Sequence, residues 1–137
     1  MRALVLAIVL AGVASAGAPD AKVLEHHGRW ESGYGAKFYN VVGRLQNTSG
    51  HALKWVKLRI DAVDAKGKVV ATTDSYNESA EALTVEGVDP KEVLRSGKVK
   101  PLDTGAEQRF RASFLADETP PFTDYRVKIV ETPAVEP

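Results

Sequence analysis

Three histidines are the residues of this chain best suited to hold a transition metal. His26 and His27 are adjacent, and His51 stands alone in a polar stretch. Adjacent residues of a strand point to opposite faces of a sheet, so His26 and His27 are poorly placed to share one ion. The chain has no cysteine and its only methionine is Met1, which argues against thiolate and thioether ligands. We therefore predict no metal and no other cofactor, and keep metal binding by these histidines as the alternative.

Carboxylates gather in the middle of the chain, where a pair could serve as the acid and the base of glycoside hydrolysis. They are Asp61, Asp64, Glu78, Glu81, Glu86, Asp89 and Glu92. No pair stands out among them, and Asp64 and Asp89 suit structural positions, in a turn and before a helix. The sequence has neither the D-x-D-x-D-G pattern of a calcium loop nor the glycine pattern around a nucleophilic serine. We therefore predict that the protein is not an enzyme.

Basic side chains recur on the predicted polar faces of the strands, whereas the acidic residues lie mostly in loops. The set comprises Arg44, Lys57, Arg59, Arg109, Arg111, Arg126 and Lys128, and Trp55 falls on the same face. If several of these strands share a sheet, the set forms a basic stripe that could hold an anionic glycan, a lipid headgroup or an acidic partner. The candidate binding residues are Trp55, Arg59, Arg109 and Arg111. The alternative is an ordinary solvated face.

Three aromatic residues, Trp30, Tyr34 and Phe38, precede the clearest strands. Aromatic side chains combine a large apolar area with specific ring geometry, and binding surfaces often use them. The cluster is therefore a second candidate platform for a small ligand. The alternative is that these residues close one end of the core.

Alternating apolar and polar residues predict the strands that would position these side chains. We expect strands at residues 22–32, 39–46, 55–62, 68–75, 109–116 and 125–130. Gly33 and Gly35 predict a loop or bulge after the first strand. Turn-forming residues at 47–50 and 64–67 join neighbouring strands. Such sequential connections predict an all-β fold, an antiparallel β-sandwich, with a small barrel as the alternative.

The long connection at residues 77–100 departs from this alternation. Asp89 suits a helix N-cap, Pro90 suits the first helical position, and Gly97 suits a stop, so we expect a short helix at residues 90–96. Residues 78–83 could form another helical turn. A connection of this length in a small domain is usually functional or disordered.

The N-terminus has the three parts of a secretory signal peptide. Met1-Arg2 is positively charged, residues 3–13 are apolar, and Ala14-Ser15-Ala16 fits a cleavage site. We predict a signal peptide at residues 1–16 cleaved after Ala16, a β-sandwich domain at 17–131 and a flexible tail at 132–137. The protein would then be secreted or periplasmic, without a membrane span. Eighteen basic and eighteen acidic residues cancel, which gives no overall charge to attract nucleic acid.

Several segments together resemble the FxLYD-type domain. They are VVGRLQNTS, VKLRIDAVDAKGKVV, PLDTGAEQRFRASF and DYRVKIV, within residues 38–130. The matching positions are Gly43, Asn47, Asp64, Gly67, Leu102, Gly105 and Phe110. The resemblance implies an immunoglobulin-like sandwich in a secreted or envelope protein of a prokaryote, and it implies no catalytic residues.

The sequence therefore predicts a non-catalytic interaction or accessory module of the cell envelope. Its partner would be an envelope protein or an anionic glycan, bound through a sheet edge or through residues 77–100. The alternative is a small-ligand or metal-binding protein that uses His26, His27, His51 or the aromatic cluster. The oligomeric state stays open.

Overall fold

The computed structural model describes residues 19–96 and 98–136, so the predicted signal peptide lies outside the described residues. The strands are β1 (Ala21–Gly33), β2 (Ala36–Asn47), β3 (Lys57–Val63), β4 (Val69–Tyr76), β5 (Glu107–Leu115) and β6 (Asp124–Glu131). The helices are α2 (Glu78–Glu81), α3 (Pro90–Leu94) and the 3-10 helix η1 (Ala116–Glu118). Over this part of the chain, no helix has both the length and the apolar character needed to cross a membrane.

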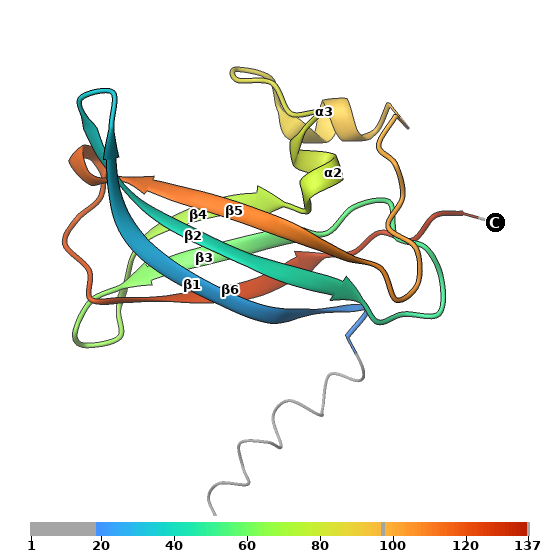
Figure 1. Ribbon diagram of the computed structural model, residues 1–137, viewed down its shortest axis with the longest axis horizontal. Coiled ribbons are helices and arrows are strands. Elements are labelled where there is room, and N and C mark those ends of the chain that lie inside the picture. The colour runs from blue at the N-terminus through green and yellow to red at the C-terminus, as the bar shows by residue number, and fades with distance from the viewer. Residues whose placement is uncertain (1–18, 97, 137) are drawn as a thin grey trace, which may run out of the picture.

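The six strands form two antiparallel three-stranded sheets, in the orders β1-β2-β5 and β4-β3-β6. Figure 1 shows the two sheets stacked on each other, with α2 and α3 together beside the end of β4. The chain changes sheet after β2, after β4 and after β5, as in Greek-key sandwiches. The predicted all-β antiparallel sandwich, with short helices in a long connection, is confirmed.

The main core lies between the two sheets and consists of every second residue along the central strands. Leu58 and Ile60 of β3 are fully buried, and they belong to the same cluster as Leu45 of β2 and Phe110 of β5. This is the alternation that the sequence predicts for half-buried strands. Burial of these side chains is the principal favourable contribution to folding.

A two-residue turn joins β1 to β2. Tyr34 and Gly35 both have positive φ, 52° and 76°, and two positive values in succession give the turn the twist that a hairpin needs. The segment around Gly33 and Gly35 is therefore a tight turn between two long strands, rather than a loop or bulge that separates them.

The connection from β4 to β5 packs on the sandwich through a second, smaller core. This second core comprises Trp55, Tyr76, Ala80, Leu94 and Val99, with Leu83 at its border. The carboxylate of Asp89 accepts a hydrogen bond from the backbone N–H of Lys91 at 3.0 Å, which caps α3 as predicted. The helix ends at Leu94, two residues before the predicted end.

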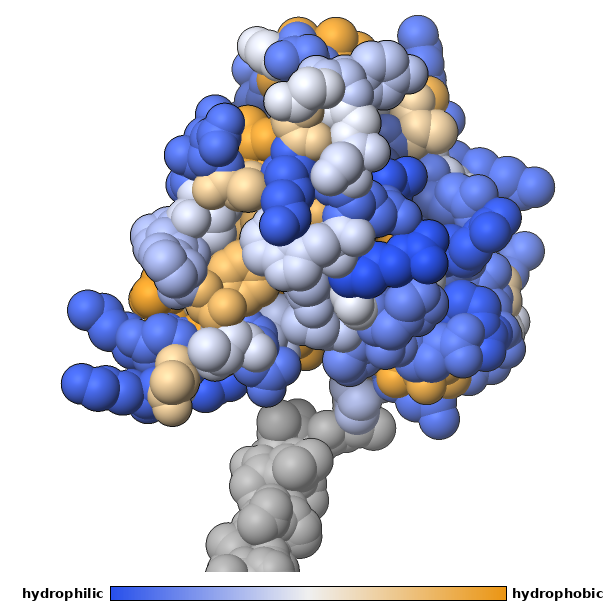
Figure 2. Space-filling model, turned by 60° about the vertical axis from the view of Figure 1, so that its left-hand side comes forward, coloured by the Kyte–Doolittle hydropathy of each residue, from blue (hydrophilic) through white to orange (hydrophobic). Residues whose placement is uncertain are grey.

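The C-terminal segment differs from the predicted flexible tail. The N–H of Lys54 donates to the carbonyl oxygen of Pro133 at 2.7 Å, and the N–H of Val135 donates to Ala52 at 2.9 Å. These hydrogen bonds hold residues 133–135 against residues 52–54. The face of the molecule drawn in Figure 2 is mostly hydrophilic, with apolar areas between hydrophilic side chains.

Candidate functional site

The basic residues predicted to form one stripe belong to two different sheets. Arg109 and Arg111 lie on β5 in the sheet β1-β2-β5, whereas Arg59 lies on β3 in the other sheet. The outer faces of two stacked sheets point away from each other. The single stripe is therefore not formed, because alternation along a strand sets its two faces but does not decide which sheet it joins.

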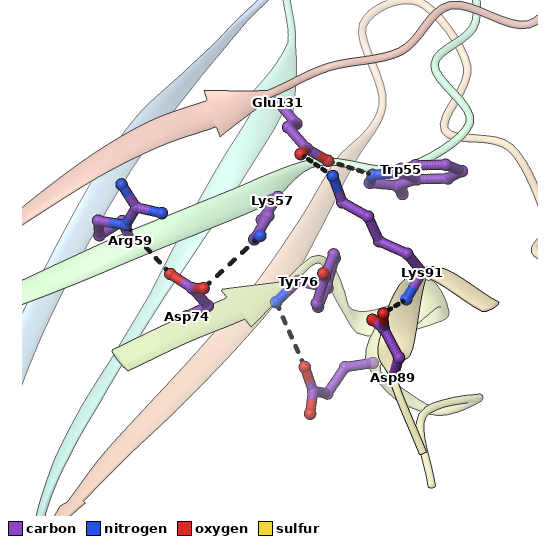
Figure 3. A network of polar contacts seen from close by, with 9 residues as sticks. Trp55, Lys57, Arg59, Asp74, Tyr76, Asp89, Lys91 and Glu131 are labelled. Atoms are coloured by element: carbon purple, nitrogen blue, oxygen red, sulfur yellow. Dashed lines mark hydrogen bonds and ion pairs between the residues drawn. The ribbon is translucent and has the colours of Figure 1, made fainter. Parts of the chain in front are cut away.

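Trp55 is a buried residue of the second core rather than a surface aromatic. The residue is 8 % exposed. Its indole Nε1–H donates to Oε1 of Glu131 at 3.2 Å, and Oε2 of Glu131 lies 2.7 Å from Nζ of Lys91 (Figure 3). Glu131, at the end of β6, therefore contacts both Trp55 and the 77–100 connection, because Lys91 belongs to α3.

The surroundings of Glu131 lower the pKa of its carboxyl group. Partial burial raises its pKa, but hydrogen bonds from Lys91 and Trp55 and the charges of Lys91 and Lys57 outweigh that effect. The net result is a pKa below the usual range for glutamate. Glu131 is therefore ionised at neutral pH and stays so into mildly acidic solution.

Arg59 is also occupied by a structural contact. Its Nε lies 3.3 Å from Oδ1 of Asp74, and Nζ of Lys57 lies 3.6 Å from the other oxygen of the same carboxylate (Figure 3). Both cations face β4 across the sheet. Trp55 thus belongs to the second core, and Arg59 pairs with Asp74 within the sheet β4-β3-β6. Of the four candidate binding residues, Arg109 and Arg111 remain available for a ligand.

Those two, Arg109 and Arg111, line a groove of 660 Å³ on the outer face of the sheet β1-β2-β5. The full lining comprises Glu25, His27, Val42, Gly43, Tyr76, Glu78, Glu81, Ala82, Arg109, Phe110 and Arg111. The strands supply the floor, and the end of β4 with α2 supplies one wall. More apolar than polar surface faces the groove.

Hydrogen bonds across the chain hold this wall in place. Oε1 of Gln108 on β5 accepts from Nδ2 of Asn77 at 2.9 Å and from the N–H of Ser79 at 3.0 Å. Oδ1 of Asn77, which is fully buried, accepts from the N–H of Val56 at 2.8 Å. These contacts fix the start of α2 beside β5, so the groove has a defined shape.

The two groove arginines differ from the neighbouring arginine of β2. Arg44 forms ion pairs with Glu25, at 3.0 Å, and with Glu107. Among the residues that the structure describes, neither Arg109 nor Arg111 forms an ion pair. The groove therefore presents two exposed guanidinium groups whose charge is not neutralised by direct contact.

Two nearby glutamates, Glu25 and Glu31, are held by other partners. The hydrogen bond and the charge of Arg44 lower the pKa of Glu25. A hydrogen bond from Asn40 is the main cause that lowers the pKa of Glu31, to which the charges of Arg29 and Arg111 add. Glu78 and Glu81 lie across the groove on α2. The side of the groove formed by β5 thus carries Arg109 and Arg111, and the side formed by α2 carries Glu78 and Glu81.

The three histidines lie at three separate places. His27 lines the groove, His51 lies in the turn after β2, and a ring nitrogen of His26 is 2.7 Å from the hydroxyl oxygen of Tyr125. Within residues 19–96 and 98–136, no group of three histidine, aspartate or glutamate side chains could hold a metal ion. The histidines therefore do not form the common site considered as an alternative.

The predicted aromatic cluster also differs in the structure. Trp30 pairs with Tyr39 and Phe38 pairs with Glu31 in the register of β1 and β2, so Trp30 and Phe38 lie on opposite faces. Trp30 instead contacts the rings of Tyr39 and Phe122, with centroids 5.2 and 5.6 Å apart. Tyr34 is fully exposed at the hairpin turn. The rings of Trp30, Tyr39 and Phe122 therefore pack together at one end of the sandwich, and Tyr34 is not part of this group.

Sequence reasoning did not bring Tyr76, Glu78, Glu81 and Ala82 together as a groove wall, although Glu78 and Glu81 are among the carboxylates it considered for catalysis. The helical turn that carries three of them was expected, but its position beside β5 depends on the contact between Asn77 and Gln108. That contact joins residues far apart in the sequence, and no local pattern indicates it.

Comparison with protein-family models, with curated proteins and with solved structures finds no match to this chain.

Proposed function

We propose that this chain is a secreted or periplasmic, non-catalytic β-sandwich module of the cell envelope that binds an anionic ligand in the groove beside Arg109 and Arg111. The resemblance to FxLYD-type domains stays a prediction, and it agrees with a binding role. The observation that carries the proposal is the pair of arginines, exposed and outside any ion pair among the described residues, at the side of a groove with a mainly apolar lining.

The spacing of the two arginines suits a ligand with more than one acidic group. Residues at positions i and i+2 of a strand point to the same face and lie roughly 7 Å apart along it. A guanidinium group binds a carboxylate with two parallel hydrogen bonds. Two such groups can hold neighbouring carboxylates, while Val42 and Ala82 contact the apolar part of the ligand.

The size of the groove limits what it holds. Sites for small molecules commonly have volumes of about 300–1,000 Å³, and the groove has 660 Å³. It therefore fits a sugar-sized or side-chain-sized acidic unit. An anionic glycan and an acidic segment of an envelope protein both supply such a unit, since both carry carboxylates.

The test compares the purified protein with a variant that carries Arg109→Glu and Arg111→Glu. The control carries Lys66→Glu and Lys68→Glu, which makes the same change in net charge at the exposed β3–β4 turn. Immobilised polygalacturonate, polyglutamate and neutral dextran serve as probes. We expect the parent and the control to bind at least one acidic polymer, less strongly as salt is raised, and the groove variant to lose that binding.

The choice between the two polymers identifies the source of the carboxylates. Binding to polygalacturonate alone indicates a glycan, and binding to polyglutamate alone indicates a protein segment. Equal binding by the groove variant and the control would overturn the proposal, because the charge of Arg109 and Arg111 would then contribute nothing specific.

A further inference from the structure

We propose that the outer edge of β6 is a second binding surface, which accepts an extended partner segment of alternating apolar and acidic residues as an additional strand. This surface is separate from the groove, because β6 lies in the sheet β4-β3-β6 and the groove lies on the sheet β1-β2-β5. The inference does not depend on the proposed function of the groove.

The first observation is the position of β6 at the end of its sheet. It pairs with β3 on one side, and among the described strands none pairs with its other side. Lys57 pairs with Glu131 while Leu58 pairs with Ile129, so Val130 is an extra residue that interrupts the ladder. The regular edge is residues 124–129, six residues with an extended length of about 20 Å.

The second observation is that the core is incompletely covered beside this edge. Tyr125, Val127 and Ile129 point into the sandwich but are only half-buried, whereas Leu58 and Ile60 of the neighbouring strand are fully buried. A strand added along β6 would place its own apolar side chains next to this row. It would therefore cover apolar surface and also pair unpaired backbone groups.

Side-chain hydrogen bonds join the β1 and β6 segments at two places along their shared border. The His26 ring and the Tyr125 hydroxyl are 2.7 Å apart at one end, and the Thr132 hydroxyl donates to Asp20 at 3.2 Å at the other. Figure 1 shows β1 and β6 following the same border of the sandwich. Between these contacts, the described residues of the two strands form no hydrogen bond.

The third observation is the charge of the edge. Arg126 and Lys128 are exposed on the outer face of β6. Their contacts are long: Arg126 Nη2 lies 3.4 Å from the carbonyl oxygen of Gly67, and Lys128 Nζ lies 3.9 Å from Asp61. Acidic residues at the facing positions of an added strand would pair with both cations.

The same charges argue against a second copy of this chain as the occupant. An antiparallel pairing of two β6 strands that keeps the apolar faces aligned can place Arg126 opposite Lys128 twice, and like charges opposite each other are destabilising. Lysines on edge strands are also a common means of preventing unspecific pairing. The edge is thus selective for a partner of opposite charge.

The test measures binding of fluorescent hexapeptides to the purified protein by anisotropy. One peptide alternates valine with glutamate, a second alternates valine with lysine, and a third has three valines followed by three glutamates. We expect the first to bind most tightly. In a variant with Arg126→Glu and Lys128→Glu its affinity should fall on the order of tenfold, and the lysine peptide should become the better ligand.

Amide hydrogen exchange separates strand addition from attraction by charge alone. The alternating acidic peptide should slow exchange at amides within residues 124–129, and it should do so in the variant Arg109→Glu with Arg111→Glu to the same extent as in the parent. The proposal is overturned if the peptides bind equally, or if binding leaves exchange in β6 unchanged. Loss of binding only in the groove variant would also overturn it and assign the peptide to the groove.

Discussion

Replacing Gly43 with alanine should destabilise the fold, because the added methyl group has no room in the middle of β2. A Cβ at Gly43 would lie 2.4 Å from the carbonyl oxygen of Glu25, and 2.6 Å from Cζ of Phe110. The oxygen belongs to the backbone, and the Phe110 ring is buried in the core. Neither neighbour can move without disturbing β1 or the packing between the sheets.

Overpacking of this kind costs typically about 1–3 kcal/mol, and the backbone contact places Gly43→Ala near the upper end of that range. For a domain of this size, a loss of about 2–3 kcal/mol lowers the melting temperature by roughly 10 °C. The measurement is urea unfolding followed by circular dichroism, with a thermal scan beside it. Gly50→Ala is the matched control, because no atom lies within 4 Å of a Cβ there.

A double-mutant cycle divides the cost between the two contacts. Phe110→Leu removes the ring atoms near Gly43 but leaves the Glu25 oxygen in place, so the double variant should lose less stability than the sum of the two single variants. The reasoning is refuted if Gly43→Ala and Gly50→Ala differ by less than about 0.5 kcal/mol in free energy of unfolding, the spread expected of ordinary surface substitutions.

Three further predictions concern the second core and the hairpin. Asn77→Ala leaves the N–H of Val56 without its acceptor, so urea unfolding should show a loss of about 1–3 kcal/mol, and unchanged stability would contradict this. The pKa of Glu131 is lowered in the folded protein, so its contribution to stability is fully present above the unfolded value of 4.5 and is lost as the pH falls through the lower folded value. Limited proteolysis should therefore cut residues 77–100 faster below pH 4.5 than above it. Glu131→Gln should remove this pH dependence. Tyr34→Gly should raise the free energy of unfolding by about 0.5–1 kcal/mol, and the melting temperature slightly with it, because Tyr34 has a φ of 52° that glycine adopts without strain. A lower melting temperature would contradict this.

The strands could be predicted from the sequence because alternation is a local property. Phe110, Ala112 and Phe114 alternate with exposed residues in the sequence, and all three are buried. The cap of α3 was equally local, since Asp89 and Pro90 lie next to the helix that they start. These features need only neighbouring residues to form.

The candidate site was only partly predictable because its parts come from different sheets. Arg109 and Arg111 were correctly expected on an outward face of one strand, but the sequence does not say that β3 belongs to the opposite sheet from β5. Trp55 was expected outside because it precedes Lys57 by two residues in the same alternation. The chain enters β3 only at Lys57, so the alternation does not apply to Trp55.

The topology has a consequence for the order in which the protein can fold. Each sheet consists of a local hairpin, β1–β2 or β3–β4, and a third strand that comes from the C-terminal part of the chain. Non-local pairings of this kind slow folding, because the intervening chain must lose its entropy before the contacts form. During synthesis, one side of β2 and one side of β3 have no strand to pair with until β5 and β6 have left the ribosome. A chaperone that binds extended segments would find its best target in that interval, before the sandwich closes.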